Sequence, residues 1–89
     1  MAHPRFSTDE IVARGKEIYE QDLRDKLEPQ NVGKYLVIDI ETAEYEMDDD
    51  DMTAALKAYQ KHPDHARYEM RIGYATSGMI GNAFVGANP

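Results

Sequence analysis

Apolar residues recur at helical spacing over residues 8–28, near the start of the chain. They are Ile11, Val12, Ile18, Tyr19, Leu23 and Leu27, and this period is typical of an amphipathic helix. Ser7 and Glu10 have the spacing of a capping box, in which each side chain binds one free backbone amide of the first turn. Gly15 weakens the middle of the helix by about 1 kcal/mol relative to Ala. Pro29 disfavours helical geometry at the residue before it, so we predict that the helix ends near residue 28.

A linker over residues 30–33 leads into a predicted β-hairpin. Residues 34–40 alternate, with Leu36, Ile38 and Ile40 on one face and Tyr35, Val37 and Asp39 on the other. A strand with apolar residues on both faces is typical of the centre of a sheet. Residues 41–44 form the turn, in which Ala43 stands where two-residue hairpins often have Gly. Residues 45–47 form a short second strand.

The run of aspartates that follows has the pattern of a helix start. With Asp48 as the N-cap, residues 49–51 place carboxylates in the first turn, where they complement the helix dipole. Met47 and Met52 then have the spacing of a hydrophobic staple. An apolar stripe is predicted to face the sheet; its members are Met52, Ala55, Leu56 and Tyr59. The sequence His62-Pro63 ends this helix.

Residues 66–74 alternate as a third strand. Its apolar side chains are predicted to face inward and its charged ones outward; these are Tyr68, Met70, Ile72 and Tyr74, and Arg67, Glu69 and Arg71. The helix between strands two and three is a crossover, so these two strands are predicted to run parallel. Placing strand three beside strand one gives the strand order 2-1-3. One helix then covers one face of strand one, and the N-terminal helix or a second copy of the chain covers Tyr35 and Val37.

We therefore expect an α+β fold in one small domain. An N-terminal helical segment (1–29) precedes a ββαβ core (34–74) with a three-stranded mixed sheet. An uncharged, Gly-rich C-terminal tail (75–89) follows. Its glycines oppose a helix, while its apolar residues oppose a solvated tail. The tail is predicted either to dock on a partner or sheet edge, or to fold back on its own sheet.

The composition restricts the function further. The chain has 89 residues and a formal net charge of −7, without the clustered Lys and Arg that phosphate binding needs, so nucleic acid is not expected as a partner. The acid is concentrated between Asp39 and Asp51, where it forms either a solvated face or a surface that attracts a basic protein. There is no Cys, and there is no apolar run of signal-peptide or membrane-span length. We expect a cytoplasmic protein that does not bind a membrane.

One motif resembles a catalytic site. Asp39-Ile40-Glu41-Thr42 matches the Asp-x-Glu-Thr that proofreading-type exonucleases carry at the end of a first strand, where the two carboxylates bind divalent metal. Too few residues follow to build the ribonuclease-H-like sheet that supplies their other ligands. We therefore expect no enzyme and no catalytic residues. A metal-dependent phosphodiesterase that uses Asp39 and Glu41 is kept as an alternative.

No other pattern predicts a cofactor or metal site. His62 and His65 could ligate a transition metal, but the sequence gives no obvious third ligand, and a polar loop is the simpler interpretation. The aspartate run does not have the spacing of an EF-hand loop. Without Cys, and with Ser7 as a helix cap, the chain has no candidate set for nucleophilic catalysis.

Three segments together resemble one bacterial family. They are GKYLVIDIETAEY (Gly33 to Tyr45), the four aspartates (Asp48 to Asp51) and RIGYAT (Arg71 to Thr76). The family consists of small, little-characterised proteins of cyanobacterial type that share GKYLVIDIETGxY, an Asp-rich helix start and RIGYPT. The resemblance covers most of the chain through Thr76, although Ala43 replaces the turn glycine and Ala75 the proline. It implies an antitoxin-like or accessory role beside a neighbouring gene product, and no functional residue set transfers with it.

These observations favour a non-enzymatic protein–protein interaction module, because a chain this small has apolar surface that it cannot easily bury alone. A protein partner is expected, and a homodimer or other homo-oligomer is plausible. The candidate partner-contact residues are Ile11, Ile18, Leu23, Leu27, Met79, Ile80 and Phe84. The alternative for the helix residues is an ordinary contact within the core. A scaffold or cargo module of a larger assembly is a further alternative.

Overall fold

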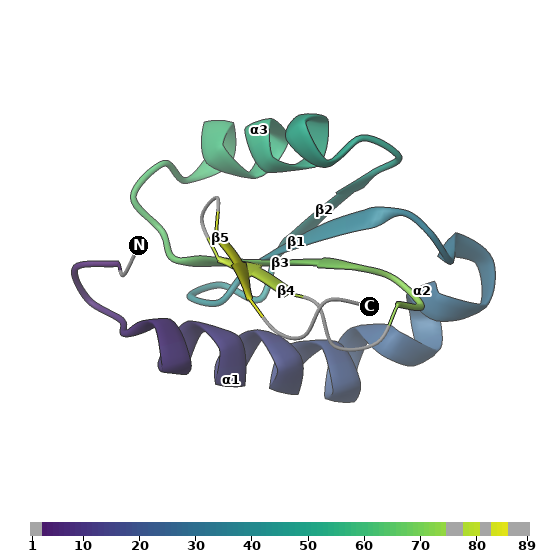
Figure 1. Cartoon of the computed structure of the whole chain (residues 1–89), viewed down its shortest axis with the longest axis horizontal. Helices are drawn as coiled ribbons and strands as arrows, with labels where there is room; N and C mark the ends of the chain where they lie inside the picture. Colours follow the sequence, from purple (N-terminus) through teal and green to yellow (C-terminus); the bar gives the residue numbers. More distant parts are fainter. Residues whose placement is uncertain (1–2, 75–77, 81–82, 86–89) are drawn as a thin grey trace.

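A computed structural model describes residues 3–74, 78–80 and 83–85, and it has three layers, with one sheet between two helical layers (Figure 1). A continuous N-terminal helical segment covers one face of the sheet. It consists of α1 (Thr8–Ile18), a π-helical turn η1 (Tyr19–Leu23) and α2 (Arg24–Asn31). The helix α3 (Asp51–Lys61) covers part of the other face. The strands are β1 (Tyr35–Asp39), β2 (Tyr45–Asp48), β3 (Arg67–Arg71), β4 (Gly78–Ile80) and β5 (Ala83–Val85).

The sheet has the order β2-β1-β3-β4-β5, so the α+β class and the predicted 2-1-3 order are confirmed. The prediction of a mixed sheet is wrong, because every pair of hydrogen-bonded neighbours in this sheet is antiparallel. Strands β2 and β3 do run in the same direction, but β1 lies between them and pairs with both. In this register Asp39 is opposite Arg67, so the end of β1 lies beside the start of β3.

Two short strands from the C-terminal tail extend the sheet. Strand β4 pairs with β3, and β5 pairs with β4. Of the two alternatives for the tail, this is the one in which it folds back on its own sheet. The side chains of Met79, Ile80 and Phe84, three of the predicted partner contacts, lie outside the described part of the structure.

A spacing of four residues organises the N-terminal helical segment. Its buried positions are Ile11, Gly15, Tyr19, Leu23 and Leu27. In an α-helix with 3.6 residues per turn, each step of four residues rotates the side chain by about 40° past its predecessor. The π-helical turn η1 has more residues per turn and reverses this drift. Leu27 therefore still faces the sheet four turns after Ile11.

The start of this helical segment is as predicted, and its end is not. Ser7 and Glu10 form the capping box: the Glu10 N–H donates to Ser7 Oγ (3.1 Å), and the Ser7 N–H donates to Glu10 Oε1 (2.8 Å). The prediction that Pro29 ends the helix near residue 28 is wrong, because α2 continues to Asn31. Pro29 lies in the last turn at an exposed position, so the Asp25 carbonyl that loses an N–H donor can be hydrated by solvent. Asn31 Nδ2 donates to the Leu27 carbonyl (2.9 Å).

The two faces of β1 are covered in the reverse of the predicted way. The N-terminal helical segment packs on the face of Leu36, Ile38 and Ile40, together with the buried Tyr68 and Ile72 of the β3 region. The opposite face, with Val37 and Tyr35, lies under α3. Neither face needs a second copy of the chain for cover. Tyr74, which was predicted to face inward at the end of strand three, is exposed, because β3 ends at Arg71.

The helix α3 presents the opposite face from the one predicted. Ala54 and Ala58 pack on Val37, whereas Met52, Leu56 and Tyr59 are exposed. The N-cap is Asp50 rather than Asp48, and its Oδ2 accepts from the Thr53 N–H (2.8 Å). The later start shifts the staple positions, so the predicted pair of Met47 and Met52 does not form one.

Replacement of Gly15 by Ala is expected to destabilise the protein by about 1–3 kcal/mol through overpacking. Helix propensity alone would predict a gain of about 1 kcal/mol. However, a Cβ on Gly15 would overlap the buried Tyr68 side chain, because α1 and β3 approach closely at this point. Urea denaturation followed by circular dichroism measures the change. A Gly15→Ala variant that is as stable as the native protein or more stable contradicts the prediction, and in a Tyr68→Ala background the loss should disappear.

Replacement of Ala43 by Gly is expected to stabilise the protein by up to about 1 kcal/mol. Ala43 has a φ of +66°, in the left-handed region that is unfavourable for a residue with a Cβ. Glycine relieves this strain, although its greater freedom in the unfolded chain offsets part of the gain. The midpoint of urea unfolding should rise. Thr42→Gly, at the neighbouring turn position, is the control and should lower it.

Candidate functional site

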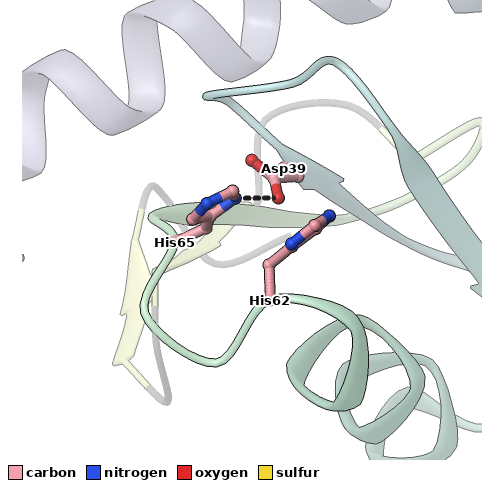
Figure 2. A group of neighbouring side chains, drawn as sticks. All are labelled: Asp39, His62 and His65. Carbon is pink, nitrogen blue, oxygen red and sulfur yellow. Dashed lines mark hydrogen bonds and ion pairs between the residues drawn. The ribbon is translucent and has the colours of Figure 1, made fainter.

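Three side chains from two distant parts of the chain meet beside the end of β1. Asp39 is the last residue of β1, His62 caps the C-terminus of α3, and His65 lies in the loop before β3 (Figure 2). One potential ligand atom from each of the three residues lies within 4.8 Å of the other two. We call these three residues the Asp–His cluster.

The carboxylate of Asp39 is fixed on both of its oxygens. Oδ1 accepts backbone N–H groups of the turn, from Glu41 (2.8 Å) and Thr42 (3.2 Å). Oδ2 lies 2.7 Å from His65 Nδ1. Asp39 is only 6 % exposed, so these contacts hold the carboxylate away from bulk water. The same side chain thus shapes the β1–β2 turn and ties it to the α3–β3 loop.

The two histidine rings stack on each other. Their centroids are 4.3 Å apart and their planes differ by 12°. His62 Nε2 also lies 3.0 Å from Glu44 Oε1, so a second carboxylate adjoins the cluster. A small hollow lies beside the Asp–His cluster. Its lining includes Val37, Glu44, Lys61 and His62. The hollow has room for about one water-sized group.

The loop that carries the histidines is held from two sides. Arg67 Nη1 donates to the backbone carbonyls of His62 and His65, each at 3.0 Å. On the other side, the Asp64 carbonyl is contacted by His3 Nε2 and by Arg5 Nη2. The backbone that carries both imidazoles is therefore held in place before any ligand binds.

The sequence indicated the two histidines but not their third neighbour. Asp39 is 26 positions before His65 in the chain, so no local spacing connects them. The predicted 2-1-3 order did contain the signal. In that order the hairpin makes strand three antiparallel to strand one, and the end of strand one then lies beside the residues that precede strand three.

The exonuclease-like motif is divided between two structural roles. Glu41 binds Arg5 Nη2 (2.9 Å) and accepts the Ala66 N–H (2.7 Å), whereas Asp39 belongs to the Asp–His cluster. Desolvation acts to raise the pKa of Glu41, but the Ala66 N–H and the Arg5 guanidinium outweigh it and hold this pKa below its ordinary value. The two carboxylates of the motif thus have different partners, and the phosphodiesterase alternative gains no support from this geometry.

The acidic stretch pairs with α3 along β2. The carboxylates of Glu44, Glu46 and Asp48 alternate along the chain and so face the same side. They contact His62 (3.0 Å), Lys61 (2.6 Å) and Lys57 (3.0 Å) respectively. The Asp50 N–H and then Lys57 lower the pKa of Asp48, and the Glu46 carboxylate raises the pKa of Lys61. Much of the acid that was predicted to be solvated or to attract a basic partner thus has a partner within the chain.

The predicted partner contacts of the N-terminal helical segment lie in the core. Ile11, Leu23 and Leu27 are buried, and Ile18 packs against the same cluster. The structure therefore gives these side chains the intramolecular contacts of the alternative interpretation. A partner would reach Ile11, Leu23 or Leu27 only if the helix left the sheet.

A different apolar surface faces solvent on α3. Met52 is 76 % exposed, Leu56 54 % and Tyr59 51 %. With the half-buried Ala55 they occupy positions i, i+3, i+4 and i+7 of one helix. We call these four residues the α3 stripe. The sequence analysis found the stripe but placed it against the sheet.

Comparison with known proteins gives no relative: no family model matches the chain, and no curated protein or solved structure matches it either. In the described part of the chain, no helix combines the length and the apolar character that crossing a membrane requires.

A second electrostatic feature lies on the α3 side of β3. Burial raises the pKa of Glu69 to about 7; Arg67 opposes this rise and Asp51 adds to it. Glu69 lies opposite Val37 in the register of β1 and β3, and it is half-buried. It therefore holds a proton in the folded state at a pH where the unfolded chain has released it.

The replacement Glu69→Gln is expected to stabilise the protein above neutral pH. Because the folded pKa is raised, the stabilisation from the bound proton is complete below the unfolded pKa and is lost as pH rises through about 7. At about pH 8 the Gln variant should gain about 1 kcal/mol, after allowance for solvent screening, and at about pH 5 much less. Urea denaturation at both values tests this. Glu17→Gln, an exposed glutamate on α1, is the matched control, and equal effects of the two variants would contradict the prediction.

Proposed function

We propose that this protein is a non-enzymatic protein-interaction module whose recognition surface is the α3 stripe. The observation that carries the proposal is the inversion of α3, which packs on its own sheet through Ala54 and Ala58 and directs its large apolar side chains outward. Exposed apolar side chains that are contiguous on one element are typical of interaction sites.

The spacing of the stripe fits one mode of recognition. In helix-in-groove binding, a helix inserts anchors at positions i, i+3, i+4 and i+7 into an apolar groove of the partner. The α3 stripe has this spacing, from Met52 to Tyr59. The ion pairs of Lys57 and Lys61 with β2 lie on another side of the helix, so they hold α3 in place without occupying the stripe.

The partner is expected to supply an apolar groove with a basic rim. Asp49 and Asp50 are exposed at the N-terminal end of α3, next to Met52. Neither carboxylate is neutralised by an ion pair in the described structure. A basic group at that end of the groove would complement them and favour one orientation of the helix.

A different protein fits the stripe better than a second copy of the chain does. An 11-residue helix is only about 16 Å long. A contact between two such helices would bury much less than the roughly 800 Å² per partner of a stable complex. A groove can enclose more of each anchor. The antitoxin-like or accessory role implied by the sequence resemblance would use such a surface to hold its partner.

Replacement of Leu56 by Glu is expected to abolish most of the partner binding. The partner is first isolated by affinity purification from the native host, and its binding to the pure protein is then measured by calorimetry. Loss of a central anchor should weaken binding by about thirtyfold or more. Because Leu56 is exposed, the free energy of unfolding should change by no more than about 0.5 kcal/mol.

The matched control is Gln60→Glu, which places a carboxylate on another exposed position of the same helix, outside the stripe. It should leave affinity within about threefold of the native value, because Gln60 is not one of the anchors. The variant's free energy of unfolding should fall by about 0.3–1 kcal/mol, since a carboxylate near the C-terminus of a helix opposes the helix dipole. Equal losses in the two variants, or unchanged binding in Leu56→Glu, would overturn the proposal. Light scattering of the free protein should show a monomer.

A further inference from the structure

We propose that the Asp–His cluster is a binding site for a divalent transition metal ion, with Zn²⁺ as the best fit. Its three candidate ligands are the Asp39 carboxylate and the imidazoles of His62 and His65. Two imidazoles and a carboxylate form a typical donor set for Zn²⁺ and its neighbours, whereas Mg²⁺ and Ca²⁺ prefer oxygen ligands alone. The inference is independent of the function proposed for the α3 stripe.

The first support is the convergence of two segments that are far apart in the sequence. The end of β1, the end of α3 and the loop before β3 each contribute one side chain (Figure 2). Each side chain has a ligand atom within 4.8 Å of the other two. A metal ion bound between them would link the hairpin turn to the end of α3.

The second support is the way the surroundings orient the ligands. Asp39 Oδ1 is occupied by two backbone N–H groups, which leaves Oδ2 directed at His65. Arg67 fixes the backbone carbonyls of both His62 and His65. In metal centres, such outer contacts set the orientation of the ligands and contribute to affinity.

Binding requires the side chains to move, because the two imidazole planes are stacked with only 12° between them and each nitrogen lone pair lies in the plane of its ring. At least one ring must rotate so that both nitrogens face the same ion. Asp39 Oδ2 and His65 Nδ1 are 2.7 Å apart, as in a hydrogen bond. Two ligands on a tetrahedral Zn²⁺, each at 2.0–2.1 Å, would be about 3.3 Å apart, so this contact would open by about 0.6 Å. The metal then replaces the shared proton. Glu44, whose Oε1 is 3.0 Å from His62 Nε2, is the nearest candidate for the fourth ligand.

The test uses the full chain without an affinity tag, because a histidine tag would bind the same ions. Calorimetric titration with Zn²⁺ is expected to give one site per chain. Titration with Co²⁺ is expected to produce the visible absorption of a tetrahedral nitrogen–oxygen site. The melting temperature should rise with Zn²⁺ concentration, since a ligand that binds only the folded state stabilises it. Mg²⁺ should produce none of these effects.

Three variants distinguish this metal site from nonspecific metal binding at the protein surface. His62→Gln and Asp39→Asn should each weaken Zn²⁺ binding by roughly tenfold or more, since even outer contacts of a metal centre contribute 10–100-fold. Asn at position 39 retains an oxygen for the turn N–H groups, so the fold should remain. Asp25→Asn, which changes an exposed carboxylate on α2 in the same way as Asp39→Asn, is the control and should leave the affinity unchanged.

Several outcomes would overturn the proposal. One is that the folded native chain shows neither a calorimetric heat of binding nor a visible Co²⁺ absorption up to millimolar metal. The cluster would then serve only to link the turn and the loop by hydrogen bonds. Another is equal weakening by Asp25→Asn and His62→Gln, which would mean nonspecific binding at the protein surface. If Asp39→Asn unfolds the chain, His62→Gln alone decides, because the His62 side chain is partly exposed and its loss leaves the turn intact.

Discussion

The fold depends on the burial of β1 from both sides. Leu36 and Ile38 on one face and Val37 on the other are almost completely inaccessible to solvent. A strand of this kind is stable only if both faces are covered, and an 89-residue chain has just enough material for one helical layer on each side. The two layers differ in thickness. The N-terminal helical segment contributes large aliphatic and aromatic side chains, whereas α3 contributes two alanines, and this difference decides where the remaining apolar side chains of α3 can go.

The acidic composition is part of the architecture as well as a source of charge. Alternate carboxylates of β2 meet cations spaced along one side of α3. Exposed ion pairs of this type contribute little free energy individually. Their value here is geometric, because a helix that rests on two alanines has few large side chains to fix its rotation about its own axis. The ion pairs select the rotation that turns the alanines inward. The order of charges along the acidic stretch therefore matters more than its total charge.

Sequence reasoning was successful where the determinants are local and unsuccessful where they depend on a partner element. The capping box of Ser7 and the strand order followed from spacing and chain connectivity. The stripe on α3 was visible, but periodicity cannot tell whether the core-facing side of a helix is its large apolar side or its small one. The sequence indicated only that Gly15 weakens the helix, although its lack of a side chain is what lets α1 approach Tyr68. The meeting of Asp39 with the histidines required a register that no single segment contains.

The wide turn at Tyr19–Leu23 determines how many residues the N-terminal helical segment can hold. In a uniform α-helix, positions four apart would have rotated by about 160° between Ile11 and Leu27, and the last of them would point into water. The wide turn holds one extra residue and so takes up about 100° of that rotation within five residues. A helix with a π-helical turn can hold one residue more than a regular helix while the same face stays buried against the sheet. The segment therefore already contains one residue that a regular helix could not hold with the same side toward the sheet.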